Sequence, residues 1–337
     1  MRRSSEAGFI GLKGERSRGV TVGQTENGRG SSEAAARAGT RPMVEFAFGA
    51  AFTSLLTIRL RTRREERLTV SDLLPTASGR FWVVDSNAAA LRIYSPEGRQ
   101  LRLLDRRATG VRQPVSLAAL HNRWIVALDG HLPAVVVMDE AGRVLRRFPL
   151  PELDRPVQVC NLEDRRLAVV GTGWGPGAGR LVHLYTTAGE YVESLFGEPQ
   201  RGRPTGRAFM AAARSAMYMG HTRTDSFAIY DVEARGVVAF SNLNSSASGR
   251  SGRYSSAAAK LSGLFAASCG PLIAQFAPST ETQDYRYDLY ALDGTPVALG
   301  LRSPERVVGV EGPLFYSVRG KDRGGCELRV WKMSWGR

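Results

Sequence analysis

The side chains that could bind an anionic or carbohydrate ligand are arginines, histidines and a tryptophan spaced widely along this sequence. They fall between short apolar runs, where loops are expected. Guanidinium and imidazolium groups bind carboxylates and phosphates, and an indole ring offers a surface for stacking. The candidate ligand-binding residues are Arg112, His131, Trp174, Arg203, His221 and Arg223.

Residues for catalysis or metal binding do not form a convergent pattern. Cys160, Cys269 and Cys326 lie far apart and show no metal-ligand spacing, so we expect them to be small apolar residues of the interior. The glycine-rich segment 171–179 opens no helix and lacks the Lys-Ser/Thr pair of a phosphate-binding loop. Catalytic residues therefore remain unknown, and we expect no metal and no cofactor.

The net charge of +14 raises the question of a nucleic-acid partner. Nearly all the cations are arginine, a bias that a GC-rich genome produces without selection for any partner. Apart from residues 59–64 the cations are scattered, whereas a nucleic-acid surface clusters them and interleaves aromatic side chains. We expect no specific nucleic-acid binding, while an anionic ligand or surface remains open.

The elements that must position these side chains repeat along the chain. An apolar run, a loop, a second apolar run, a tight glycine turn and a third run recur, and an earlier short run precedes each unit. The first runs begin near residues 81, 124, 167, 216, 272 and 314. Four short strands in a unit of roughly 45 residues are typical of a propeller blade. The sequence therefore predicts an all-β fold, a six-bladed β-propeller with four antiparallel strands per blade.

The last blade lacks its outer strand, because the chain nearly ends after the run at 327–331. An unpaired apolar edge would be open to aggregation. The run at 52–60 precedes the first blade and has no other partner. We predict that this N-terminal strand completes the last blade and closes the ring.

Two segments divide the chain. Residues 1–42 are rich in Gly, Ser, Arg and Glu, which predicts a disordered extension, and a true start at Met43 remains open. Residues 43–337 form the predicted propeller. The apolar run at 46–58 has the length of a signal-peptide core, but its cations follow it, so we expect a cytoplasmic monomer with export as the alternative. No apolar stretch reaches about 20 residues, which predicts no transmembrane span.

The first blade carries a family resemblance. The segments WVVDSN at 82–87 and LRIYSPEGR at 91–99 resemble an NHL-type repeat, as found in six-bladed propellers of the NHL-repeat-like and TolB-like superfamily. The resemblance implies that Asp85 and Asn87 cap the loop between the second and third strands. WD40 repeats are disfavoured because no Trp-Asp pair ends a strand, and kelch repeats because no Gly-Gly pair recurs.

The candidate ligand residues share one predicted face of the propeller. Loops that enter the innermost strands and loops between second and third strands both surround one mouth of the channel. This face is mildly basic, so we predict a non-catalytic binding module for an unknown protein or for an anionic or carbohydrate ligand. The alternative is a hydrolase or lyase of the lactonase-esterase type, which needs converging carboxylates for calcium. At the predicted entrances of the innermost strands only Glu305 is acidic.

Overall fold

The structure is a computed structural model, and only part of the chain is described here. None of residues 1–50 is included, so the predicted disordered extension over 1–42 and the start at Met43 lie outside the described residues and stay predictions. The described residues are 51–62, 66–120, 123–162, 165–174, 178–197, 207–222, 226–242, 260–267, 270–278, 283–320 and 326–333.

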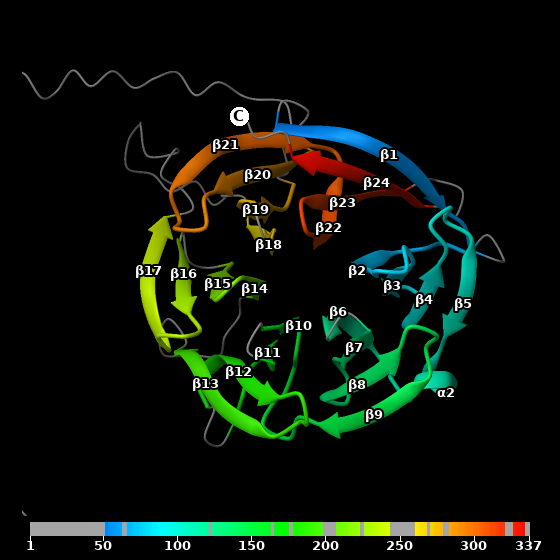
Figure 1. Cartoon of the computed structure of the whole chain (residues 1–337), viewed down its shortest axis with the longest axis horizontal. Helices are drawn as coiled ribbons and strands as arrows, with labels where there is room; N and C mark the ends of the chain where they lie inside the picture. The colour runs from blue at the N-terminus through cyan, green and yellow to red at the C-terminus, as the bar shows by residue number, and fades with distance from the viewer. Residues whose placement is uncertain are drawn as a thin grey trace, which may run out of the picture. The chain divides into compact units, whose positions relative to one another are not determined.

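Six four-stranded antiparallel sheets form the blades of a ring (Figure 1). Blade 1 contains β2 (Val70–Pro75), β3 (Phe81–Asp85), β4 (Ala90–Tyr94) and β5 (Gln100–Leu104), and blade 2 contains β6 (Pro114–Leu120), β7 (Trp124–Asp129), β8 (Ala134–Asp139) and β9 (Val144–Pro149). Blade 3 contains β10 (Gln158–Asn161), β11 (Arg166–Val170), β12 (Arg180–Thr186) and β13 (Tyr191–Gly197), and blade 4 contains β14 (Ala208–Ala213), β15 (Ala216–His221), β16 (Ser226–Asp231) and β17 (Gly236–Asn242). Blade 5 contains β18 (Leu261–Ala266), β19 (Leu272–Phe276), β20 (Tyr285–Tyr290) and β21 (Pro296–Ser303). The predicted fold class is confirmed.

Blade 6 joins the two ends of the propeller. Its strands are β22 (Arg306–Glu311), β23 (Leu314–Gly320), β24 (Cys326–Met333) and, outermost, β1 (Phe52–Leu60). Strand β1 pairs antiparallel with β24, from Phe52 opposite Met333 to Leu60 opposite Cys326. The predicted closing strand is confirmed with the same limits.

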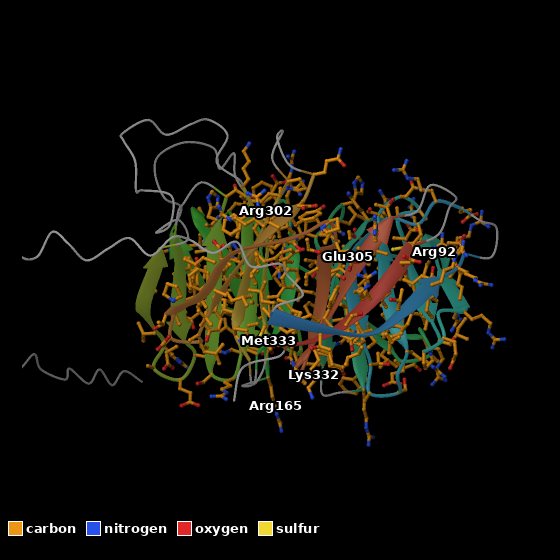
Figure 2. The ribbon with its side chains drawn as sticks, turned by 90° about the horizontal axis from the view of Figure 1, so that it is seen from above. Arg92, Arg165, Arg302, Glu305, Lys332 and Met333 are labelled. Carbon is orange, nitrogen blue, oxygen red and sulfur yellow. The ribbon has the colours of Figure 1, made fainter. Side chains whose placement is uncertain are left out.

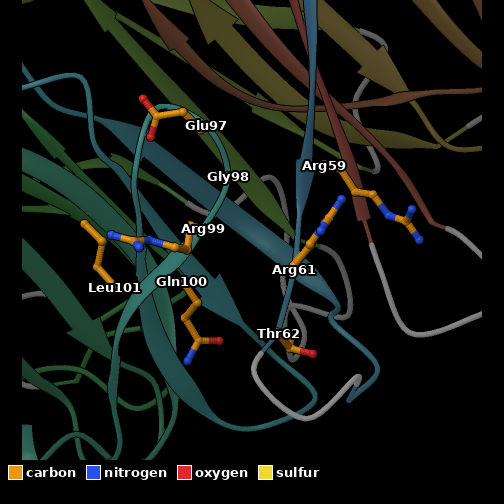
Figure 3. A pocket seen from close by; sticks show the side chains of 8 residues that line it. All are labelled: Arg59, Arg61, Thr62, Glu97, Gly98, Arg99, Gln100 and Leu101. Carbon is orange, nitrogen blue, oxygen red and sulfur yellow. The ribbon is translucent and has the colours of Figure 1, made fainter.

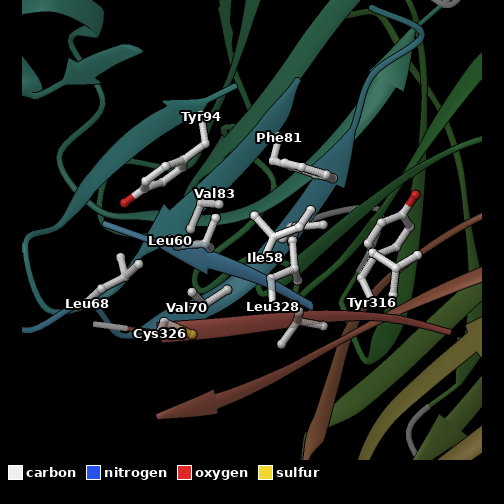
Figure 4. Close-up of a cluster of buried hydrophobic side chains, with 13 residues drawn as sticks. Ile58, Leu60, Leu68, Val70, Phe81, Val83, Tyr94, Tyr316, Cys326 and Leu328 are labelled. Atoms are coloured by element: carbon white, nitrogen blue, oxygen red, sulfur yellow. The ribbon is translucent and has the colours of Figure 1, made fainter. Parts of the chain in front are cut away.

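The closing strand is held by side chains as well as by backbone pairing. Ile58 and Leu60 are buried in a cluster shared by the first and last blades (Figure 4). Leu60 is fully buried, whereas Leu56 on the same strand is 48% exposed. Because burial of apolar side chains is the main stabilising term, this cluster ties the start of the propeller to its end.

The end of β1 also contacts the turn between β4 and β5. The N–H of Arg61 donates to the carbonyl oxygen of Gly98 at 3.2 Å. Gly98 has φ +80°, and a Cβ there would lie 2.4 Å from the carbonyl oxygen of Arg59. Only glycine fits this turn, because the backbone is left-handed and the closing strand passes directly over it.

The second and third strands of the blades form most of the core. Every residue of β3, β4 and β11 is buried. Neighbouring blades cover both faces of such a strand, so its sequence is mostly apolar and does not alternate between apolar and polar residues. The outermost strand β9 is largely exposed, and β5 is exposed at Arg102 and Leu103.

An aspartate caps the loop after the second strand in each of the first two blades. The carboxylate of Asp85 accepts N–H groups of Asn87 and Ala88, as the resemblance implies for this aspartate, and pairs with buried Arg92 at 2.8 Å. The carboxylate of Asp129 accepts N–H groups in blade 2 in the same way. This repeated cap fixes the second-to-third-strand loops on one face of the ring.

Figure 2, which views the ring edge-on, separates its two faces. Glu305, which precedes an innermost strand, lies toward one face, and Arg165, in a turn between first and second strands, lies toward the other. In the part of the chain that the structure describes, the strands are joined by loops and by the short helix α2 (Arg106–Thr109). No helix among the described residues is long and apolar enough to cross a membrane.

Candidate functional site

A cavity of about 720 Å³ occupies the channel at the face that carries the capped loops. Innermost strands of all six blades contribute to its wall, together with the loops that enter them. Its volume lies in the range of small-molecule sites. The charged and aromatic residues that line it are Asp72, His131, Asp154, Arg155, Arg207, Phe209, Phe265 and Arg306.

Irregular pairing in the innermost strands directs side chains into this cavity. Strands β2, β6, β18 and β22 each carry a bulge near their start. The bulged residues are Ser71, Val115, Ser262 and Val308, and all four line the cavity. A β-bulge leaves one residue unpaired and re-aims its side chain, so the bulges decide what a ligand meets.

Polar side chains in blades 1 to 3 join each innermost strand to the next blade. Asp72 and Ser116 are the first residues after the bulges of β2 and β6, and Gln158 is the first residue of β10, which has no bulge. Oδ2 of Asp72 accepts the N–H of Leu117 at 2.7 Å, and Oγ of Ser116 accepts the N–H of Val159 at 3.3 Å. The amide of Gln158 accepts the N–H of Met210 at 2.8 Å and donates to the carbonyl of Met210 at 2.6 Å. These groups are satisfied within the protein and serve first to hold the channel wall together.

Asp72 is the carboxyl group of this wall that titrates in an unusual range. Burial raises its pKa from 3.8 to about 6, although the N–H of Leu117, the hydroxyl of Ser116 and the charge of Arg306 favour the ionised form. The loss of hydration on burial raises the pKa of Asp72 by more than these partners lower it. Asp72 is therefore partly protonated in mildly acidic solution.

The cavity carries more cations than acids. Arg155, Arg207 and Arg306 contribute guanidinium groups, against the carboxylates of Asp72 and Asp154. Arg155 and Asp154 are both well exposed, and their atoms approach only to 3.8 Å. Arg207 is exposed and, among the described residues, makes no ion pair. Such a lining favours an anionic ligand.

The side chains of His131 and Arg112 lie together on the loop face. The Arg112 guanidinium lies 3.4 Å from Nε2 of His131. Both backbone N–H groups donate to the buried carboxylate of Asp129, which fixes the two loops relative to each other. His131 lines the cavity, and Arg112 stands beside it.

Trp174 lies on the same face but outside the cavity lining. Its indole N–H donates to the carbonyl of Pro151 at 2.8 Å, and its backbone N–H donates to Glu152. The ring is 54% exposed, so the loop holds it in place while leaving it open to solvent. The role of Trp174 as a stacking surface stays a prediction.

Of the remaining predicted ligand residues, the structure describes His221. His221 is buried at the end of β15, opposite Ala208, and does not line the cavity. Arg203 and Arg223 lie outside the described residues. Of the four predicted ligand residues that the structure describes, only His131 lines the cavity itself.

Several cavity residues were missed by reasoning from the sequence. Arg306 begins an innermost strand, Arg207 immediately precedes one, and Arg155 lies three residues before one. This position near a strand entrance was the available signal. Asp72, Phe209 and Phe265 lie inside apolar-looking strands, where a pattern of strands alone gives no reason to single them out.

Glu305, the one acid predicted at a strand entrance, is a structural residue. Its carboxylate pairs with Arg329 at 2.7 Å and accepts the Ser317 hydroxyl at 2.5 Å, and the Trp331 indole donates to that hydroxyl at 2.7 Å. Glu305 is 3% exposed and does not line the cavity. Within the described ranges no three His, Cys, Asp or Glu side chains are placed to bind a metal ion together.

The two described cysteines have no role in this cavity. Burial raises the pKa of the Cys160 thiol to about 12 and that of Cys326 to about 11. Both are free thiols, and neither lines the cavity. A thiol with a raised pKa is a poor nucleophile, which fits packing roles. Cys269 lies outside the described residues.

A second hollow lies on the outer rim, where β1 meets the β4–β5 turn. Arg59, Arg61 and Arg99 line it with Glu97, and Glu327 stands opposite Arg59 in the β1–β24 pairing. Figure 3 shows the Arg59 and Arg61 side chains on one side and the Arg99 side chain pointing the other way. Because these cations do not converge, the rim hollow is a weaker ligand site than the channel.

Solved structures of low sequence identity share this fold. A protein of Bacteroides fragilis described as exported aligns with a TM-score of 0.62 at 10% identity, covering 87% of this chain and 98% of that one. A DUF4221 family member from Bacteroides vulgatus gives 0.59 at 7%, covering 85% and 98%. A catalytically inactive virginiamycin B lyase from Staphylococcus aureus, with quinupristin, gives 0.54 at 9%, covering 83% and 99%. No family model and no curated protein sequence matches the chain.

These likenesses establish the six-bladed propeller and nothing finer. An NHL-type or TolB-like membership is not confirmed by them. The three neighbours differ in what they are described as doing, so the fold alone does not separate binding from catalysis.

Proposed function

We propose that this chain is a non-catalytic binding module that takes an anionic ligand into the mouth of its channel. The observation that carries the proposal is the cavity of about 720 Å³, with three guanidinium groups and the His131 ring against two carboxyl groups. Arginine is suited to this role because its planar donors match a carboxylate or a phosphate. The ligand group is either a small anion or an acidic group of a protein partner.

Binding is favoured over catalysis by the way the cavity acids are used. Asp72 accepts backbone N–H groups of two strands, and Asp154 lies beside Arg155. A hydrolase of the lactonase-esterase type would need several oxygen ligands converging on one calcium ion. That enzyme, or a lyase such as the structural neighbour from Staphylococcus aureus, remains the second candidate, and calcium-dependent turnover of a lactone would favour it.

The test is a calorimetric titration of the full chain with citrate and, separately, with inorganic phosphate. We expect saturable binding that weakens as ionic strength rises, because the contacts are between charges. Arg207→Gln should weaken binding by about tenfold, within the effect of one lost charged contact. Arg123→Gln, an exposed residue of the β6–β7 turn, removes the same charge elsewhere and should leave binding unchanged. Equal loss in both variants would show a response to net charge and no site at the channel.

A further inference from the structure

The cavity wall formed by blades 4 to 6 differs in chemistry from the rest of the channel. It combines two guanidinium groups, two aromatic rings, a hydroxyl and an amide on consecutive blades. The residues are Arg207 and Phe209 of blade 4, Ser262, Phe265 and Gln275 of blade 5, and Arg306 of blade 6. A ligand that fits this wall must carry an anionic group for the guanidinium groups, an apolar surface for the rings and polar groups for hydrogen bonds.

The aromatic part of the wall is shaped by a glycine. A Cβ at Gly263 would lie 2.7 Å from Cε2 and 3.0 Å from Cζ of Phe265. The ring of Phe265 therefore lies over Gly263 in space that any other residue would occupy. Phe209 on β14 is half-buried, as Phe265 is, and both residues line the cavity. Aromatic rings pack well against apolar C–H groups.

The amide of Gln275 is held in one orientation. Its Oε1 accepts the N–H of Val307 at 2.8 Å, a bond that only the oxygen can accept. The Tyr287 hydroxyl also lies 3.1 Å from this oxygen. Nε2 must then be the donor end, and it lies 3.3 Å from Oγ of Ser262. The Ser262 hydroxyl donates in turn to the backbone carbonyl of Gln275 at 3.2 Å, and Gln275 is 1% exposed. The Ser262 oxygen, which lines the cavity, therefore keeps one lone pair that can accept a ligand hydroxyl group.

The two guanidinium groups keep donors for a ligand. Arg306 donates from one nitrogen to the carbonyl of Val70, which uses one of its five N–H groups. Arg207 is exposed at the entrance of β14. Asp72 is the acid that faces Arg306, and its raised pKa reduces the competition that it offers in mildly acidic solution.

We propose that the wall of blades 4 to 6 binds an acidic sugar, with its carboxylate at Arg207 and Arg306 and its ring against Phe265. This inference rests on the proposed function of the channel and names its ligand class. A simple carboxylate would leave the rings and the Gln275–Ser262 pair unused. A neutral sugar would leave the cations unused, and an aromatic acid without hydroxyl groups would leave the Ser262 oxygen unused.

The test uses the full chain and three probes in calorimetry and ligand-observed NMR. Digalacturonate carries all the required groups, maltose lacks the carboxylates, and citrate lacks the sugar ring. We expect digalacturonate to bind at least about tenfold more tightly than either of the other probes. Equal binding of citrate would overturn the sugar assignment while the proposed function stands. Equal binding of maltose would overturn the role of the arginines, and failure of all three probes would overturn both proposals.

Variants assign the contacts to this wall. Arg207→Gln should weaken digalacturonate binding and leave the weak binding of maltose unchanged. Gly263→Ala should weaken both sugars, because its Cβ displaces the Phe265 ring. Phe265→Leu is a second variant that removes the ring without adding a clash, and thermal unfolding checks that each variant is folded. Arg123→Gln is the charge control. If Gly263→Ala and Phe265→Leu both fold and bind digalacturonate as the parent does, the ring has no part in binding and the proposal is wrong.

Discussion

The two halves of the channel wall are built from equivalent positions but do different work. In blades 1 and 2 the residue after the bulge of the innermost strand is Asp72 or Ser116, and in blade 3 the first residue of β10 is Gln158. Each of these side chains bonds to the next blade. In blades 4 to 6 the equivalent residues in the strand pairing are Phe209, Gly263 and Gly309. In blades 1 to 3 these polar side chains therefore form hydrogen bonds within the protein.

In blades 4 to 6 these positions carry no polar side chain. Gly309 shows the contrast: a Cβ there would lie 2.4 Å from the carbonyl oxygen of Leu73, so blades 6 and 1 pack at this position by close backbone approach. Side chains elsewhere bond these blades to their neighbours, as Arg306 does with the carbonyl of Val70 and Gln275 with the N–H of Val307. The bulged Ser262 and the cations at the strand entrances line the cavity. We therefore propose that blades 1 to 3 of the channel wall serve structure and that blades 4 to 6 also serve ligand binding.

The largest expected effect comes from removing the strand that joins the two halves. Deleting residues 44–60 removes β1, leaves β24 unpaired and takes Ile58 and Leu60 out of their cluster. We expect an insoluble protein, or one with no cooperative unfolding transition by circular dichroism, because an open edge and an exposed core remain. A cooperatively folded deletion variant would show that the ring does not need this strand.

A point substitution gives a graded version of the same experiment. Leu60→Ala should lower the free energy of unfolding by about 2–5 kcal/mol, since the fully buried side chain leaves a cavity. Leu56→Ala on the same strand is the control, and its 48% exposed side chain should make it nearly neutral. Equal effects would mean that β1 is held by backbone pairing alone.

The next effect lies in the half that we assign to structure. Gln158→Ala should destabilise the protein by about 1–3 kcal/mol, because it leaves the N–H and carbonyl of fully buried Met210 without their partner. Urea unfolding measures this change. Gln113→Ala is the matched control, because Gln113 is exposed at the same face. Digalacturonate binding should not change, and a loss of binding in a fully folded Gln158→Ala variant would contradict the division into halves.

A smaller effect should depend on pH. The pKa of Asp72 is raised from 3.8 to about 6 in the folded protein, so the folded state binds more protons than the unfolded state between these values. Stability from this group therefore increases as the pH falls through that range. Asp72→Asn is neutral at every pH, so its stability relative to the parent should be highest above about pH 7 and fall by about 1–3 kcal/mol toward about pH 4. A difference that stays constant across this range would mean that Asp72 is not perturbed.

The sequence predicted the ring because its evidence is periodic. Short apolar runs recur at blade spacing, and the run at 52–60 had no other partner, so even the limits of β1 followed. The loop face was predicted because alternating strands force alternate connections to one side. These features depend on local pattern and connectivity alone.

The cavity lining could not be predicted in the same way. The bond from Asp72 to Leu117 joins residues 45 positions apart, and its existence depends on how two blades meet. Bulges at Ser71 and Ser262 leave no mark in an apolar run, yet they decide which side chains enter the channel. His221 shows the converse, because a loop-end histidine was expected to face the mouth and is instead buried.

The smallest expected effect on stability belongs to the half that we assign to the ligand. Arg207→Gln should change the free energy of unfolding by less than about 0.5 kcal/mol, since the side chain is exposed and substitutions at such positions are usually near neutral. Thermal and urea unfolding measure this, beside the binding loss expected from calorimetry. A residue that is dispensable for folding but needed for binding is what the comparison requires of blades 4 to 6. If Arg207→Gln instead destabilises the protein as much as Gln158→Ala does, both halves of the wall are structural, and the binding site must be sought elsewhere on the loop face.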